Sequence, residues 1–167
     1  MSPEGLDFLV DALDLAAGDL EGGVGNDPLE VLIQQLAEPK KMAVAGGLAD
    51  VHAELLMRRY QVDVAGAYHA IQQVLGEEFS KKSGTILVTG GGFGLYPMDE
   101  FLPLSMDEAA LRAMCIALHN KLKEQNVYVG TLTVTDSIIP GTRCDPALLA
   151  EDFWKMYVER GECELMH

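Results

Sequence analysis

Two short runs of mainly apolar and β-branched residues flank a long helical segment, and this arrangement limits the possible folds more than any other feature. The runs are TILVT at 85–89 and VYVGTLTV at 127–134, and the helical segment extends from 105 to about 124. Strands that alternate with helices pair in parallel, because the intervening helix carries the chain back across the sheet. The sequence therefore predicts an α/β domain built on a parallel sheet.

Further helices and strands are expected before and after this central unit. An Asp-Pro pair marks a helix start before the helical segment 28–39, and a second one precedes a last helix that begins at Pro146 and is expected to stop at Gly161. Apolar residues at three- and four-residue steps predict two successive helices within 48–79. The short apolar run 42–46 predicts a buried strand.

The chain has 167 residues, of which 49% are apolar and 23% charged, as in an ordinary globular domain. A domain of about 150 residues buries roughly 70% of the surface of its unfolded chain, so a single core is feasible. We treat 1–167 as one domain. The apolar stretch at 6–15 fits a strand or a short helix, of which we favour the strand, and the arrangement of residues 1–40 stays open.

Charge and cysteine content exclude several kinds of partner. Twelve basic against 26 acidic residues give a net charge of −14, so nucleic acid is not expected as a partner. The first residues lack the basic segment of a secretory signal, and no apolar run approaches the roughly 18 residues that cross a membrane. Three cysteines fit neither a disulfide framework nor a zinc site, and the histidines are scattered. We therefore expect a cytoplasmic protein without a metal site or a membrane partner.

A glycine cluster follows the first of the two β-branched runs. The sequence TGGGFG at 89–94 satisfies T-G-x-x-x-G, the pattern with which some nucleotide-binding folds wrap a turn around a pyrophosphate. Such a turn must open directly into a helix, whereas Pro97 and Pro103 interrupt any helix here. We prefer a tight turn after a central strand, and keep Gly90 and Gly91 as candidates for cofactor contact.

Several of these segments together resemble the second half of a short-chain dehydrogenase/reductase. Residues 84–88, 104–111 (LSMDEAAL) and 127–134 are similar to the family's G-x-I-V-N-I-S-S, Y-x-A-S-K-A-A-L and I-R-V-N-x-V-x-P-G, in the same order. VDVAG at 62–66 is similar to the family's V-N-V-x-G. The resemblance covers roughly 40–160, and implies an incomplete Rossmann-like, doubly wound parallel sheet with flanking helices.

The resemblance also implies that the family's catalytic residues are replaced. Asp63 stands at the family's asparagine, Gly91 at its serine, Leu104 at its tyrosine and Glu108 at its lysine, with the steps of thirteen and four residues between the last three retained. Family members use these four side chains to pass a hydride and a proton between a nicotinamide and a carbonyl compound. Leucine has no proton to donate, and a carboxylate raises the pKa of a neighbouring hydroxyl. No catalytic residue is therefore expected.

Three further residues, Tyr96, Ser105 and Asp136, also need an interpretation. Tyr96 is the only phenol nearby and the one possible substitute acid, although an ordinary loop tyrosine is the preferred interpretation. Glu108 and Ser105 together match a capping box, which would explain the glutamate as a helix-capping residue. Asp136 comes directly after Val134 and Thr135, which stand at the family's P-G, and is a third candidate for cofactor contact.

The family's pyrophosphate-binding loop has no counterpart in residues 1–40, so no cofactor is expected. In the family's sheet order, 3-2-1-4-5-6, loss of the first two strands opens the sheet in its middle. An exposed central edge pairs readily with another chain, so residues 1–40 should cover it or the chain should associate. We expect a homo-oligomer, formed as in the family through the helices near 60–80 and 105–124.

The sequence thus supports two hypotheses about function. The first is a non-catalytic, truncated relative of the short-chain dehydrogenases that acts as a self-associating or partner-binding module. The alternative is an NAD(P)-dependent oxidoreductase of an atypical branch, completed by another chain, which would bind NAD or NADP.

Overall fold

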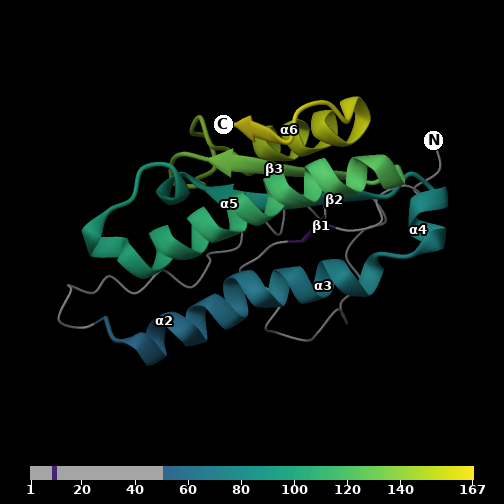
Figure 1. Ribbon diagram of the computed structural model, residues 1–167. Coiled ribbons are helices and arrows are strands. Elements are labelled where there is room, and N and C mark those ends of the chain that lie inside the picture. Colours follow the sequence, from purple (N-terminus) through teal and green to yellow (C-terminus); the bar gives the residue numbers. More distant parts are fainter. Residues whose placement is uncertain (1–8, 11–50) are drawn as a thin grey trace, which may run out of the picture.

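The described residues, Leu9–Val10 and 51–167 of a computed structural model, form one sheet with helices on both sides (Figure 1). The four strands are parallel and lie in the order β1-β2-β3-β4. Their bounds are Leu9–Val10 for β1, Thr85–Gly91 for β2, Tyr128–Val134 for β3 and Glu164–Met166 for β4. The two predicted central strands and their parallel pairing are confirmed. The predicted helix 28–39 and strand 42–46 lie outside the described residues.

The segment before β2 forms two successive helical stretches, as the sequence predicted. The first is α2 (Ala53–Tyr60), which continues through a π-helical turn (Gln61–Gly66) into α3 (Ala67–Val74). The backbone becomes extended at Leu75, and the short helix α4 (Glu77–Lys81) follows. A π turn inside a longer helix often marks a functional position, and here it includes Asp63.

The helix after the glycine cluster begins earlier than predicted. Helix α5 spans Leu102–Leu122, so Ser105 lies inside its first turns instead of capping its start. Pro103 sits in the first turn, where the fixed backbone angle of proline favours a helix and its missing N–H is no loss. The Ser105 hydroxyl accepts a hydrogen bond from the backbone N–H of Met98 at 3.2 Å. The predicted capping box is therefore wrong.

The last helix, α6, spans Pro146–Glu159, and Asp145 caps it by accepting a hydrogen bond from the N–H of Ala147 at 2.8 Å. It ends at Arg160, whose backbone is left-handed with a φ of 48°, and not at Gly161 as predicted. The Arg160 guanidinium donates to the carbonyl oxygens of Ser83 and Gly84. These two hydrogen bonds hold Arg160 in the left-handed conformation, which glycine adopts more readily.

Each face of the sheet is covered by its own helices. Ile86, Val88 and Val129 point to one face, where α3 and α5 bury apolar residues against them. Leu87 and Leu132 point to the other face, where they pack with Phe153 and its neighbours on α6. This alternation follows from the two-residue period of a strand. The incomplete, doubly wound parallel sheet with flanking helices that the sequence predicted is confirmed.

The N-terminal strand covers part of the sheet edge that would otherwise be open. Leu9 pairs with Leu87 and Val10 with Val88, which accounts for two of the seven residues of β2. The preference for a strand within 6–15 is confirmed at these two residues. Among the helices of the described residues, none combines the length and the apolar character needed to cross a membrane.

Candidate functional site

The residues at the family's serine and lysine positions contact each other directly. Gly91 is the last residue of β2 and Glu108 lies in the second turn of α5. The backbone N–H of Gly91 donates to the Glu108 carboxylate at 2.7 Å. A Cβ atom at residue 91 would lie 2.9 Å from Oε1 of Glu108, so the carboxylate occupies the space that a side chain at 91 would need.

The glycine cluster forms a turn that packs closely against α5. Gly90 and Gly91 belong to β2 and pair with Thr133 and Val134, so the turn begins only at Gly92. A Cβ atom at Gly94 would lie 2.9 Å from the backbone carbonyl carbon of Glu108. The predicted tight turn is observed, and its last glycine lets the turn approach the helix backbone.

The remaining sequence candidates are spread over α5 and two loops. Leu104, at the family's tyrosine position, is half-buried two residues into α5. Tyr96 lies in the loop before α5 and is 68% exposed. Asp136 follows β3 and is exposed, and its carboxylate accepts a hydrogen bond from the N–H of Ser137 at 2.7 Å. The structure therefore brings Gly91 and Glu108 together, while Tyr96 and Asp136 stay on exposed loops.

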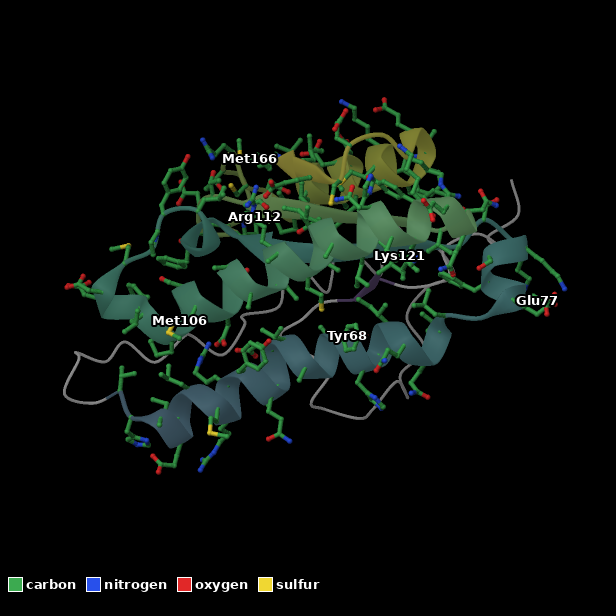
Figure 2. The ribbon with its side chains drawn as sticks, in the orientation of Figure 1. Tyr68, Glu77, Met106, Arg112, Lys121 and Met166 are labelled. Carbon is green, nitrogen blue, oxygen red and sulfur yellow. The ribbon has the colours of Figure 1, made fainter. Side chains whose placement is uncertain are left out.

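An ion pair one helical turn after Glu108 joins α5 to the last strand. The Arg112 guanidinium donates to both carboxylate oxygens of Glu164, at 2.8 and 2.6 Å, and Glu164 also accepts from the Thr133 hydroxyl at 2.7 Å. Figure 2 shows Arg112 on α5 beside β4, which ends at Met166. These hydrogen bonds to the charged form lower the pKa of Glu164. The polar side of α5 is thus anchored to the sheet.

Asp63 takes part in a second polar contact, with residues that the sequence analysis did not single out. Arg59 on α2 donates through Nε to Asp107 at 3.1 Å and through Nη2 to Asp63 at 3.2 Å. Asp107 lies on α5 and is only 4% exposed. Burial, followed by the negative charge of Asp63, raises the pKa of Asp107 to about 6, although Arg59 opposes this shift.

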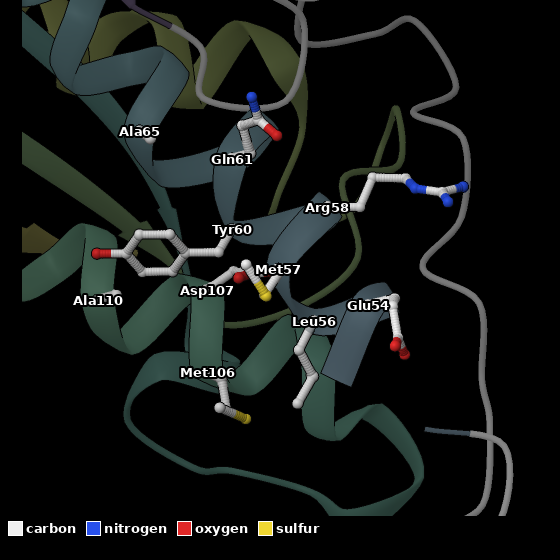
Figure 3. A pocket seen from close by; sticks show the side chains of 10 residues that line it. All are labelled: Glu54, Leu56, Met57, Arg58, Tyr60, Gln61, Ala65, Met106, Asp107 and Ala110. Atoms are coloured by element: carbon white, nitrogen blue, oxygen red, sulfur yellow. The ribbon is translucent and has the colours of Figure 1, made fainter. Parts of the chain in front are cut away.

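This three-residue cluster lies beside an apolar groove of about 790 Å³ between α2 and α5 (Figure 3). Leu56, Met57 and Tyr60 form the α2 side of the groove, and Met106 and Ala110 form the α5 side. The Asp107 side chain also lines it. The arrangement therefore combines an apolar surface with an acidic group held just beneath it.

Metal binding and thiol chemistry find little support in the described part of the chain. There, no group of three or more histidine, cysteine or acidic side chains is placed to hold a metal ion. Cys115 is fully buried on α5, and burial raises the pKa of its thiol to about 12. A thiol with so high a pKa stays protonated near neutral pH and is a poor nucleophile.

No protein-family model matches the sequence, and no curated protein matches it. Solved structures do resemble the fold. A short-chain dehydrogenase from Sphingobium yanoikuyae in complex with NADPH is 16% identical, with a TM-score of 0.59, over 83% of this chain and 62% of that one. 4-hydroxyisoleucine dehydrogenase complexed with NADH and succinate is 11% identical, with a TM-score of 0.65, over 75% of this chain and 63% of that one.

A bulky-bulky ketone specific alcohol dehydrogenase from Comamonas testosteroni is 14% identical, with a TM-score of 0.60, over 85% of this chain and 60% of that one. The alignments thus span between 60% and 63% of the length of these three dehydrogenases. The described part of the chain therefore has a Rossmann-like fold similar to that of the short-chain dehydrogenases. The resemblance inferred from the sequence motifs is confirmed at the level of the fold.

Proposed function

We propose that this chain is a non-catalytic relative of the short-chain dehydrogenases that acts as a self-associating module. The non-catalytic role is supported above all by the hydrogen bond from the Gly91 N–H to the Glu108 carboxylate at 2.7 Å. It places a negative charge where the family resemblance expects a lysine, and such a charge raises the pKa of a nearby hydroxyl instead of lowering it. Leu104 supplies a hydrocarbon at the position of the proton donor.

The helices expected to mediate association expose apolar side chains next to the groove. Met57 is 72% exposed, Tyr60 51% and Met106 47%. Exposed apolar surface of this kind favours a protein partner, and the net charge of −14 argues against a nucleic acid. Because protruding side chains and a groove share one face, that face suits a two-fold contact with a second copy of itself. We place the module in the cytoplasm, as its cysteine content favours.

Sedimentation equilibrium at tens of micromolar should reveal a dimer of the wild-type chain. Replacing Tyr60 and Met106 together by serine should weaken the dimer by about tenfold or more, because buried aromatic and methionine side chains dominate such contacts. The matched control replaces Leu148 and Val158 by serine; these residues lie on α6, at the other face of the sheet, and are 43% and 61% exposed. A wild-type chain that stays monomeric, or equal effects of both double variants, would contradict the proposal.

An NAD(P)-dependent oxidoreductase completed by another chain is the second candidate. It is favoured by the position of Gly90, Gly91 and Asp136 at the carboxyl ends of β2 and β3, where open α/β sheets bind ligands. Two of the similar dehydrogenases were solved with NADPH or NADH bound.

Titration of the purified chain with NADH and with NADPH, followed by nicotinamide fluorescence or calorimetry, separates the two candidates. We expect no binding at micromolar concentrations, because Glu108 adds negative charge beside the candidate contact residues and the phosphates are anionic. Micromolar binding that Gly91→Leu abolishes, and that the exposed-loop control Asp99→Asn leaves intact, would favour the oxidoreductase instead.

A further inference from the structure

Three side chains from three helical segments meet below the α2–α5 groove, and their charges do not balance. Arg59 comes from α2, Asp63 from the π-helical turn and Asp107 from α5. One guanidinium contacts two carboxyl groups, at 3.2 Å for Asp63 and 3.1 Å for Asp107. With both carboxyl groups ionised the cluster has a net charge of −1, whereas one added proton makes it neutral.

Arg59 holds the two carboxyl groups close to each other. The nearby carboxylate of Asp63 disfavours a second negative charge on Asp107. Their side chains are only 13% and 6% exposed, so water compensates poorly for a second negative charge. Asp107 therefore binds a proton more tightly than an isolated aspartate does.

Other charged groups on the surrounding elements are directed elsewhere or exposed. Glu108, the neighbour of Asp107 on α5, binds the Gly91 N–H. Glu54 and Arg58 on α2 line the same groove and are exposed, as are Asp99 and Glu100 in the turn before α5. Among the described residues, Asp63 and Arg59 carry the charges that act on Asp107.

We propose that the Arg59–Asp63–Asp107 cluster makes association of the α2–α5 face dependent on proton uptake, so that the dimer tightens as the pH falls from neutral to mildly acidic values. This inference rests on the proposed self-association. A second copy seated on the groove removes further water from Asp107, and the loss of water disfavours the ionised form. In a two-fold contact the negative charges of both clusters also face the same interface.

The sign of the pH dependence follows from the same cluster. The pKa of Asp107 is raised from 3.8 to about 6, so the folded chain binds this proton more tightly than the unfolded chain. The stabilisation is fully present below pH 3.8 and is lost as the pH rises through about 6. The unfolding midpoint of the wild type should therefore gain, relative to Asp107→Asn, as the pH falls from 7.5 to 5.

The test measures the dimer dissociation constant of the full chain at pH 7.5 and pH 5. We expect it to fall by about tenfold or more for the wild type, as linked uptake of one proton per subunit allows. In Asp107→Asn, residue 107 is uncharged at either pH. This variant should associate more tightly than the wild type at pH 7.5, and its dissociation constant should change little between pH 7.5 and pH 5. Asp99→Asn removes one exposed acidic charge and should keep the wild-type response, which separates the cluster from the general effect of net charge.

Each result decides a different part of the inference. A wild-type chain that stays monomeric at both pH values overturns the proposed association and its proton linkage together. A wild type that associates with the same pH dependence as Asp107→Asn overturns the linkage alone. If Asp107→Asn does not fold, Asp63→Asn replaces it, because this variant also leaves one carboxyl group for one guanidinium. Unfolding midpoints of the variants, measured well below the dimer dissociation constant, then report on the cluster independently of association.

Discussion

Replacing Phe153 by alanine should lower the free energy of unfolding by about 3–5 kcal/mol, the usual range for a buried aromatic side chain. Phe153 is 1% exposed and lies at the centre of the contact between α6 and the sheet. Its neighbours there include Leu87 and Leu132, from the two central strands. A loss of this size is a large part of the total stability of a domain. Urea unfolding followed by circular dichroism measures it.

The adjacent Trp154 provides the matched control. It is the larger side chain, but it is 42% exposed and contacts Tyr157 on the outer side of α6 at a ring distance of 5.4 Å. Trp154→Ala should therefore destabilise the chain by about 1 kcal/mol, since little of its apolar surface becomes newly hydrated. Equal losses for the two variants would mean that α6 does not bury this face against the sheet.

The sequence predicted those elements whose signals are local. The runs at 85–89 and 127–134 became β2 and β3, because β-branched residues favour extended backbone and the intervening helix requires parallel pairing. The Asp145-Pro146 pair marked the start of α6, since it combines a capping carboxylate with a residue suited to the first helical turn.

The predictions that were wrong concern residues held by distant partners. Ser105 and Glu108 have the spacing of a capping box, but the Glu108 carboxylate instead accepts a hydrogen bond from Gly91, 17 residues earlier. Gly161 is a common type of helix stop, but α6 ends at Arg160, whose guanidinium binds two carbonyl groups just before β2. A local pattern cannot show that a tertiary contact will take its place.

The Arg59–Asp63–Asp107 cluster could be predicted from the sequence only in part. Arg59 and Asp63 are four residues apart in a helical segment, so their contact could have been predicted from the sequence. In the sequence, Asp107 is one of two adjacent acidic residues near the start of the helix predicted from residue 105. Only the packing of α5 beside α2 buries it next to the other two, which is why the fold was needed to find the cluster.

Gly84→Ala should destabilise the chain by about 3 kcal/mol, at the upper end of the usual range for overpacking a core. A Cβ atom at this buried position would lie 2.1 Å from a ring carbon of Phe79. The ring cannot turn away easily, because Phe79 is 8% exposed and belongs to the core under α3 and α5. The backbone is equally fixed, since the Gly84 N–H donates to the Phe79 carbonyl at 2.9 Å. Thermal and urea unfolding both measure the loss.

A double-mutant cycle identifies the ring as the cause. In a Phe79→Ala background the added methyl group meets no ring, so Gly84→Ala should then cost less than about 1 kcal/mol, and the two effects should be strongly non-additive. Gly161→Ala is the control substitution, because a Cβ atom there would have no neighbour within 4 Å, and it should leave stability nearly unchanged. If Gly84→Ala destabilised the chain no more than Gly161→Ala does, this result would contradict the close contact between Phe79 of α4 and residue 84. The same close approach positions Ser83 and Gly84 for Arg160, so its loss would also release the end of α6 from the sheet.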